Sequence, residues 1–300
     1  MDKYTYKQAV TKVVLGATAE NGGTRDFVLT VGGSVTMPFS DAKQLEEPVI
    51  AFEIMDKKPS DPAPQLEAIW GDVWHDASLW AEKCVKDYSA KAICINFISV
   101  KPEEGGTSPQ KACETLRKVL SRVKVPIIVK GTGIAEIDNK LLPALAEEGR
   151  GERLLIGPVL QENYKEILSG VIEYGHTVIA ESPIDINIAK QTNIMLTDLG
   201  VEASRIFMDP TTGALGYGLE YSYSIMERAR LAGLGGDKAL AQPFINFVGL
   251  ESWRSGEGRK IGYLWEAITA LSFIQAGSDL VVMQHPSAVE KVREMLKSVA

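Results

Sequence analysis

The stretch PVIAFEIMD at residues 48–56 is a mostly apolar run followed by a polar loop, and it is the first of eight such runs. Runs of Val, Ile and Phe without polar alternation are typical of strands buried on both faces, as parallel sheets require. Each run is followed by a helix-like stretch, so the sequence predicts a closed (β/α)8 TIM barrel. The other seven runs are KAICINFIS from Lys91, PIIVKGTG from Pro126, RLLIGP from Arg153, TVIAESP from Thr177, RIFMDPTT from Arg205, PFINFVG from Pro243 and DLVVMQHP from Asp279.

The stretches between these runs have the features of helices. Apolar residues recur at helical spacing within 160–175 and within 287–299. Ser108 followed by Pro109 predicts a capped helix start. Three glycines stand where helices are expected to end, namely Gly175, Gly200 and Gly277.

Residues 1–47 precede the first barrel strand and contain the apolar stretches KVVLGATAE and RDFVLTVGGSVTMPF. Asn21-Gly22-Gly23 separates them, which predicts a β-hairpin. We expect this N-terminal hairpin extension to cover one end of the barrel, and a contact with a partner is the alternative. The expected organisation is a single domain over residues 1–300, with the barrel in 48–300.

Composition limits the functional classes. Lys and Arg number 32 against 39 Asp and Glu, a net charge of −7, which argues against a nucleic-acid or anionic membrane surface. No apolar run approaches the roughly 20 residues that span a bilayer. The start MDKYTYKQAV lacks the apolar segment of a signal peptide, so a cytoplasmic protein is expected.

Cysteine spacing argues against a metal or iron–sulfur site in this chain. Cys84, Cys94 and Cys113 lack the tight pairs that such sites normally use. We expect buried apolar thiols, two on helices and Cys94 in a strand. Three tryptophans, Trp70, Trp74 and Trp80, are expected in one helix as core or interface residues.

Loop lengths indicate which end of the barrel is functional. The strand-to-helix links DKKPSDPAP, SVKPEEGGTSP, DPTTGALGYGLE and LESWRSGEGRKIGYL are long, whereas most helix-to-strand links are short. The link LAGLGGDKALAQ before Pro243 is an exception without an explanation from sequence. Long ordered loops usually carry function, so the site is expected at the carboxyl ends of the strands.

These strand ends hold mostly neutral hydrogen-bonding groups and few basic ones. Gly131-Thr132-Gly133 is a weak candidate for a phosphate cradle. One candidate set of carboxylates for hydrogen-bonding a heterocycle or for acid–base chemistry consists of Asp56, Glu181 and Asp209. The alternative is that each carboxylate fixes a loop by accepting hydrogen bonds from backbone N–H groups. The expected cofactor-binding residues are Asp56, Asn96, Ser99, Lys130, Thr132, Gly133, Glu181, Ser182, Asp209, Thr211, Thr212, Gly213, Gln284 and His285.

The three histidines do not assemble a catalytic centre. His75 is expected in a helix and His176 at the amino end of a strand, where structural roles are favoured. His285 stands at a functional strand end, but no Cys or Ser nucleophile is evident for a base role. No H-E-x-x-H motif occurs, so neither catalytic residues nor metal ligands are predicted.

Several longer stretches together resemble a known family. They are Gly32-Gly33 with Met37-Pro38-Phe39, PVIAFEIMD, NFISVKPEEGG, VKGTG and MDPTTGALGYGLEYSYSIMER. Their order and the length of the chain resemble the small subunit of the corrinoid iron–sulfur protein, the methyl carrier of the reductive acetyl-CoA pathway. The similarity covers essentially the whole chain.

The resemblance implies a corrinoid-binding barrel that is a non-catalytic subunit. A large subunit would supply an iron–sulfur domain and a cobamide-binding domain, and the cobamide would lie between that domain and the carboxyl ends of the barrel. A methyltetrahydrofolate-dependent methyltransferase would donate the methyl group, and acetyl-CoA synthase would receive it. The sequence agrees, since it has neither cluster cysteines nor a D-x-H-x-x-G cobalt-ligating motif.

Two alternatives remain open. Asp56, Asn96 and Asp209 look like the pterin pocket of dihydropteroate synthase-like barrels, which favours a pterin- or folate-binding methyltransferase. Against it, the chain continues FVGLESW after the seventh strand, without the further asparagine of the methyltransferases. The other alternative is a barrel used only as a structural or interaction module.

Overall fold

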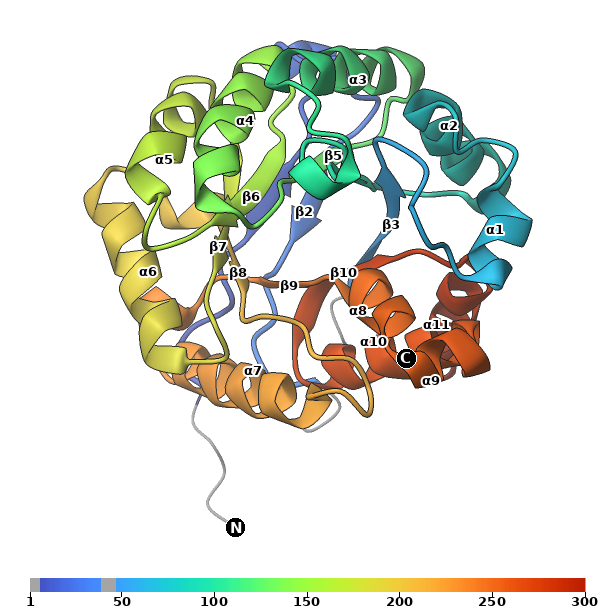
Figure 1. Cartoon of the computed structure of the whole chain (residues 1–300). Coiled ribbons are helices and arrows are strands. Elements are labelled where there is room, and N and C mark those ends of the chain that lie inside the picture. The colour runs from blue at the N-terminus through green and yellow to red at the C-terminus, as the bar shows by residue number, and fades with distance from the viewer. Residues whose placement is uncertain (1–5, 39–46, 300) are drawn as a thin grey trace. The chain divides into compact units, whose positions relative to one another are not determined.

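The computed structural model describes residues 6–38 and 47–299, so Phe39 of the Met37-Pro38-Phe39 stretch lies outside the described residues. Eight strands form a closed barrel in the order β10-β3-β4-β5-β6-β7-β8-β9, which confirms the predicted fold (Figure 1). Neighbouring strands run parallel, with Ile93 opposite both Phe52 and Ile127. The strands are β3 (Val49–Met55), β4 (Ile93–Asn96), β5 (Ile127–Lys130), β6 (Leu155–Val159), β7 (Thr177–Glu181), β8 (Ile206–Asp209), β9 (Phe244–Asn246) and β10 (Ser278–Met283).

Helices follow the strands as expected from the sequence. Ser108 caps α3 by accepting a hydrogen bond from the Lys111 N–H group. Gly175, Gly200 and Gly277 follow helices with φ of 74°, 97° and 105°, values that favour glycine. The α-helices are α1 (Pro64–Trp70), α2 (Ala77–Tyr88), α3 (Pro109–Arg122), α4 (Ala135–Glu148), α5 (Tyr164–Glu173), α6 (Ile186–Asp198), α7 (Leu219–Leu234), α8 (Val248–Arg254), α9 (Gly256–Ile261), α10 (Tyr263–Gln275) and α11 (Pro286–Val299).

Two local expectations were wrong. The three tryptophans do not share one helix, because α1 ends at Trp70 and Asp76 caps α2 by accepting the Ser78 N–H. Trp70, Trp74 and Trp80 are nevertheless at most 4% exposed and pack ring against ring, which confirms their core role. The β9-to-α10 link is not a plain loop either, since it contains the short helices α8 and α9.

The chain divides into two compact units. The N-terminal unit comprises Val14–Leu29 and Ala51–Ile179, and the C-terminal unit comprises Met1–Val13, Thr30–Ile50 and Ala180–Ala300. Two of the four unit boundaries fall inside the barrel strands β3 and β7. The single domain over residues 1–300 stays a prediction.

The N-terminal extension forms the expected hairpin sheet from β1 (Val13–Leu15) and β2 (Leu29–Val31). Its connection is longer than a tight Asn-Gly turn, because residues 16–28 include the 3-10 helix η1 (Ala19–Asn21). Gly22 ends that helix with φ of 81°.

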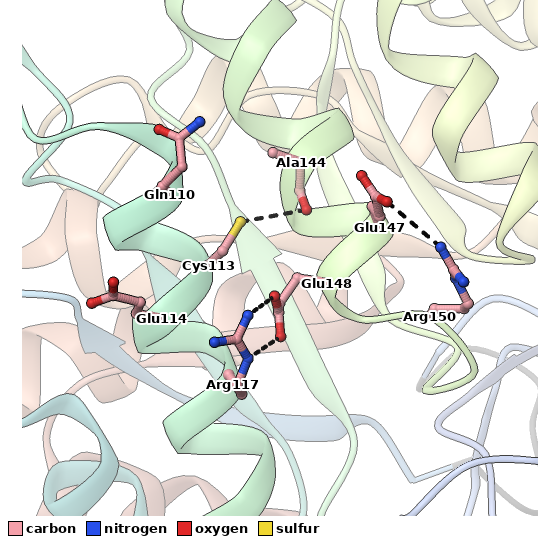
Figure 2. A pocket seen from close by; sticks show the side chains of 8 residues that line it. All are labelled: Gln110, Cys113, Glu114, Arg117, Ala144, Glu147, Glu148 and Arg150. Atoms are coloured by element: carbon pink, nitrogen blue, oxygen red, sulfur yellow. Dashed lines mark hydrogen bonds and ion pairs between the residues drawn. The ribbon is translucent and has the colours of Figure 1, made fainter.

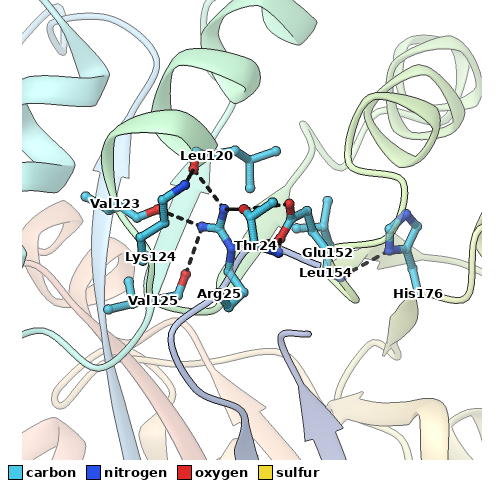
Figure 3. Close-up of polar contacts among 9 residues, drawn as sticks. All are labelled: Thr24, Arg25, Leu120, Val123, Lys124, Val125, Glu152, Leu154 and His176. Atoms are coloured by element: carbon cyan, nitrogen blue, oxygen red, sulfur yellow. Dashed lines mark hydrogen bonds and ion pairs between the residues drawn. The ribbon is translucent and has the colours of Figure 1, made fainter. Parts of the chain in front are cut away.

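Arg25 anchors this extension within the N-terminal unit (Figure 3). Its buried guanidinium donates to Glu152 at 2.8 Å and to the carbonyl oxygens of Leu120 at 2.8 Å and Val123 at 2.7 Å. Burial lowers the pKa of Arg25, and Glu152 opposes this effect. These partners precede β5 and β6, so the extension covers the amino ends of those two strands.

In the C-terminal unit, the long link before Pro243 has a structural role that the sequence did not reveal. The Lys7 and Thr11 N–H groups donate to carbonyl oxygens at both ends of this link, each at 2.7 Å. The Asn193 side chain of α6 donates to the Ala239 carbonyl at 2.8 Å, inside the 3-10 helix η4 (Lys238–Leu240). The link therefore connects residues 7–11 to α6 and α7.

A buried ion pair joins α7 to β10 in the same unit. Arg230 donates to Asp279 and, at 2.6 Å, to the Gly277 carbonyl, and its guanidinium lies 4.6 Å from the Phe244 ring centroid. The Phe244 N–H donates to Asp279 at 2.8 Å. Burial raises the pKa of Asp279, and the charge of Arg230 opposes this effect.

Candidate functional site

Asp56 and Ser99 follow β3 and β4 in the N-terminal unit, and they bind each other. Asp56 accepts the Ser99 N–H at 3.0 Å and also the Ser99 hydroxyl, whose oxygen lies 2.6 Å from the Thr107 hydroxyl. Burial raises the pKa of Asp56 more than these hydrogen bonds lower it. The pair ties two strand-to-helix loops together, which supports the loop-tying interpretation of this carboxylate.

Thr132 and Gly133, after β5, are bound by a carboxylate of their own chain. Asp138 of α4 accepts the Thr132 N–H and hydroxyl, each at 2.9 Å, and the Gly133 N–H at 2.8 Å. A Cβ atom at Gly131 would lie 2.8 Å from the Asp138 carboxylate, so this position requires glycine. The phosphate-cradle interpretation was wrong, because a buried negative charge takes the N–H groups that an anion would need. Lys130 is the half-buried last residue of β5.

Asn96, the last residue of β4, lies beside a buried acid that the sequence analysis did not single out. Its Nδ2 donates to Glu53 at 2.9 Å, and the two residues are 3% and 1% exposed. Glu53 is the only charged residue within β3. A single acid in an otherwise apolar strand was the signal in the sequence, and the sequence analysis overlooked it.

In the C-terminal unit, the loop after β8 is built by a network of hydrogen bonds. Thr211 donates its N–H to Asp209 at 3.0 Å and its hydroxyl to the Ser182 carbonyl at 2.8 Å. Ser222 donates to the Thr211 carbonyl at 2.7 Å and accepts the Gly213 N–H at 3.0 Å. Thr211 has φ of 66°, which is unusual for a β-branched residue and often marks a functional site. Glu181 is the half-buried last residue of β7.

Thr212 connects this loop to β9 through a second residue that the sequence analysis missed. Its hydroxyl oxygen accepts the Phe247 N–H at 3.0 Å and the Asn246 side-chain amide at 3.3 Å. Asn246 is the fully buried last residue of β9. An asparagine therefore does stand at the end of the seventh barrel strand, although none follows it in FVGLESW. Its strand-end position within an apolar run was the signal.

Two polar atoms near this loop are buried without a hydrogen-bond partner among the described residues. They are the hydroxyl oxygen of Ser182 and the side-chain oxygen of Asn246. Buried polar atoms are almost always paired in native proteins, and an exception calls for a bound group or a functional reason. By contrast, Asp56 after β3 and both Thr132 and Gly133 after β5 form hydrogen bonds with other residues of the chain.

Glu266 of α10 organises the end of β10 in the C-terminal unit. This fully buried carboxylate accepts the Trp253 indole N–H at 2.9 Å, the His285 N–H at 3.1 Å and the Gln284 N–H. It fixes the backbone of Gln284 and His285 at the start of α11. Glu266 was also missed from the sequence, where it is one acid in an apolar helix.

The His285 ring is held neutral at this strand end. It stacks with Trp253 and with Tyr263, whose ring centroids lie 5.8 and 5.3 Å away, and its Nδ1 accepts the Ser287 N–H at 3.1 Å. Burial lowers the pKa of His285 to about 4. Because Nδ1 is an acceptor, the proton of the neutral ring lies on Nε2, so His285 presents a donor and not the lone pair that a base requires.

The remaining histidines and the cysteines are structural or peripheral. The His176 ring accepts the Leu154 N–H at 3.1 Å (Figure 3). The ring also lies 2.8 Å from the Ala146 carbonyl. His75 lies exposed in a turn instead of the expected helix. Cys84 and Cys94 are buried, whereas Cys113 is only half-buried. Within 6–38 and 47–299, no group of three or more His, Cys, Asp or Glu residues is arranged to hold a metal ion.

A groove of about 660 Å³ lies on the outer helices of the N-terminal unit (Figure 2). Arg117 of α3 binds Glu148 of α4 through two hydrogen bonds of 2.8 and 2.6 Å, and Cys113 lies 3.5 Å from the Ala144 carbonyl. The charged lining residues are paired, Glu114 with Lys111 and Glu147 with Arg150. The lining residues come from α3, α4 and the turn after α4, and none of them follows directly on a strand. We do not assign it a role. The lining residues are Gln110, Cys113, Glu114, Arg117, Ala144, Glu147, Glu148 and Arg150.

The fold and its strand ends define a class of protein: a (β/α)8 barrel with neutral polar groups at the carboxyl ends of its strands. Two dihydropteroate synthases share the fold. The enzyme from Thermus thermophilus has a TM-score of 0.60 at 14% identity, with 96% of this chain and all of that chain covered. The enzyme from Xanthomonas albilineans has a TM-score of 0.59 at 16% identity, with 85% and 94% covered.

Sequence comparisons identify the family. Residues 12–296 match the model of the CO dehydrogenase/acetyl-CoA synthase delta subunit. The acetyl-CoA decarbonylase/synthase complex subunit delta of Methanopyrus kandleri is 35% identical over 304 residues, with 97% of this chain and 75% of the relative covered. That of Archaeoglobus fulgidus is 35% identical over 316 residues, with 99% and 70% covered. The chain belongs to this delta-subunit family, which confirms its resemblance to the small corrinoid iron–sulfur subunit.

Proposed function

We propose that this chain is the corrinoid-binding, non-catalytic subunit of a methyl-carrying complex. Membership of the delta-subunit family carries this proposal. Its partners are a large subunit that holds the iron–sulfur cluster and a cobamide-binding domain, a methyltetrahydrofolate-dependent methyltransferase that donates the methyl group, and acetyl-CoA synthase that receives it.

The groups at the strand ends fit a corrinoid. A corrin ring carries side-chain amides, each with N–H donors and a carbonyl acceptor. The C-terminal unit offers matching neutral groups, including the unpartnered oxygens of Ser182 and Asn246 and the Nε2–H donor of His285. When bound, the corrinoid supplies the cobalt that carries the methyl group.

The chain's own residues bind and orient the ligand. Glu266 fixes the backbone at His285, and the Thr211 hydrogen bonds fix the loop after β8. Neither unit offers cobalt a histidine lone pair at these positions, because Nδ1 of His285 already accepts the Ser287 N–H. We therefore assign cobalt ligation to the large subunit, and the family resemblance assigns the iron–sulfur cluster to the same subunit.

A pterin- or folate-binding methyltransferase is the second candidate. Asn246 favours this candidate. The methyltransferases carry an asparagine near the end of the seventh strand, and Asn246 is a buried asparagine at that strand end although FVGLESW contains none. The shared fold of the dihydropteroate synthases is compatible with it but shows the fold alone.

Equilibrium binding separates the candidates. Calorimetry of the free chain with methyltetrahydrofolate and absorbance titration of the heterodimer with aquocobalamin are the two measurements. We expect corrinoid binding by the heterodimer and no heat with millimolar methyltetrahydrofolate. Heat in the calorimeter together with a colourless heterodimer would establish the second candidate. Assembly of a heterodimer that binds neither ligand would indicate a structural module.

A further inference from the structure

Ser182 and Asn246 are the two site residues in the C-terminal unit with side-chain oxygens that are buried and unpartnered among the described residues. Ser182 follows β7 and Asn246 ends β9, the two strands that flank β8, and β8 ends at Asp209. We propose that these two residues form a subsite that recognises one amide edge of the bound ligand. This inference rests on the proposed function and deepens it.

The loop after β8 connects the two residues. Thr211 donates its hydroxyl to the Ser182 carbonyl at 2.8 Å, and the Thr212 hydroxyl oxygen accepts the Asn246 amide at 3.3 Å. The Ser182 N–H donates to the Asp209 carbonyl at 2.9 Å. The loop thus fixes the backbone of Ser182 and the amide plane of Asn246, and leaves one oxygen of each side chain unpaired.

The chemistry of these two oxygens is complementary to an amide. The Asn246 oxygen accepts a hydrogen bond from the ligand N–H, and the Ser182 hydroxyl donates one to the ligand carbonyl. Corrin side-chain amides have this donor–acceptor edge, and so does the ring lactam of a pterin. A carboxylate or phosphate ligand has no N–H to offer, so it would leave Asn246 unpaired.

Access to the subsite requires movement of the loop at residues 209–213. Ser182 and Asn246 are 1% and 0% exposed. Thr211 is held at φ of 66° by its two hydrogen bonds, a backbone conformation that is unfavourable for threonine. Release of Thr211 lets this residue relax to an ordinary conformation, which favours the opening that admits the ligand.

The test compares three single variants. Ser182→Ala and Asn246→Ala remove the unpartnered oxygens. Asn193→Ala is the matched control, because Asn193 is equally buried and has an unpartnered side-chain oxygen, yet it bonds to the link before β9. The measurements are aquocobalamin affinity of the corrinoid-free heterodimer by absorbance, 6-methylpterin affinity of the free chain by calorimetry, and the Tm of the free chain.

The proposal predicts about tenfold weaker ligand binding for Ser182→Ala and for Asn246→Ala, the loss of one neutral hydrogen bond. Binding by Asn193→Ala stays at the wild-type level. Ser182→Ala raises the Tm of the free chain by about 2 °C, because an unpaired buried hydroxyl is removed. If the corrin supplies the amide, the two variants lose affinity for aquocobalamin. If a pterin supplies it, they lose affinity for 6-methylpterin.

Two results overturn the inference. If Ser182→Ala and Asn246→Ala both bind both ligands with wild-type affinity, the proposed subsite is wrong, while the proposed function is unaffected. A lower Tm for Ser182→Ala shows that its hydroxyl is paired in the free protein. A wild-type heterodimer that binds no corrinoid instead contradicts the proposed function itself, so the two failures are distinguishable.

Discussion

Acidification tests the neutral state of His285, which the site requires. The ring is buried and stacks with Trp253 and Tyr263, and its Nδ1 accepts the Ser287 N–H. Protonation converts Nδ1 into a donor and breaks this hydrogen bond, besides placing a charge in an apolar stack. Burial accordingly lowers the pKa of His285 to about 4.

The size and sign of the effect follow from proton linkage. The gap between an ordinary histidine pKa of about 6.5 and about 4 corresponds to about 3 kcal/mol of unfolding free energy. The unfolded chain takes up this proton first as the pH falls. The His285 contribution is therefore fully present above about pH 6.5 and is lost progressively down to about pH 4.

Urea unfolding of wild type and His285→Gln between pH 7.5 and pH 4.5 measures this contribution. Burial raises the pKa of Asp56, Asp138 and Asp279, which favours the folded state in acid, but both proteins share these groups. Their difference in unfolding free energy isolates His285. We expect wild type to lose about 2–3 kcal/mol relative to the variant over this range. A difference that stays constant with pH refutes the neutral, buried ring.

Three further predictions concern stability and reactivity. Arg230→Met leaves Asp279 buried without its cation and lowers the unfolding free energy by about 3–5 kcal/mol in urea denaturation, whereas adding Asp279→Leu restores most of it. Asp138→Ala frees three donors after β5, so amide hydrogen exchange at residues 132–133 accelerates; unchanged exchange would contradict the assigned contacts. Half-buried Cys113 reacts first with maleimide, as seen by mass spectrometry, and reaction of Cys84 before unfolding would contradict its burial.

The barrel was predictable because its strands are encoded locally. Each is a short apolar run with a polar strand end, and glycines such as Gly175 mark helix ends without reference to distant residues. The long loops also predict the functional site at the carboxyl ends of the strands, and this stays a prediction. The missed break between Trp70 and Ala77 depended on a cap at Asp76, which interrupts an apolar pattern of helical spacing.

The pairing of site residues was not predictable, because it depends on contacts between separate loops and helices. The sequence suggested that Thr132 is available for a ligand, but Asp138 of α4 accepts hydrogen bonds from its N–H group and its hydroxyl. Conversely, Asn246 and Glu266 were hidden inside apolar runs, although most polar side chains buried in such runs form hydrogen bonds. Searching each predicted strand and helix for a single polar residue would have found both.

The most direct test of the corrinoid-carrier role is the cobalt and iron content of this chain purified alone and co-produced with its large subunit. Size-exclusion chromatography with visible spectra and metal analysis measures both. We expect a colourless, iron-free chain alone and a heterodimer that contains one corrinoid. Stoichiometric iron in the chain alone, or a cobalt-free heterodimer, would contradict it.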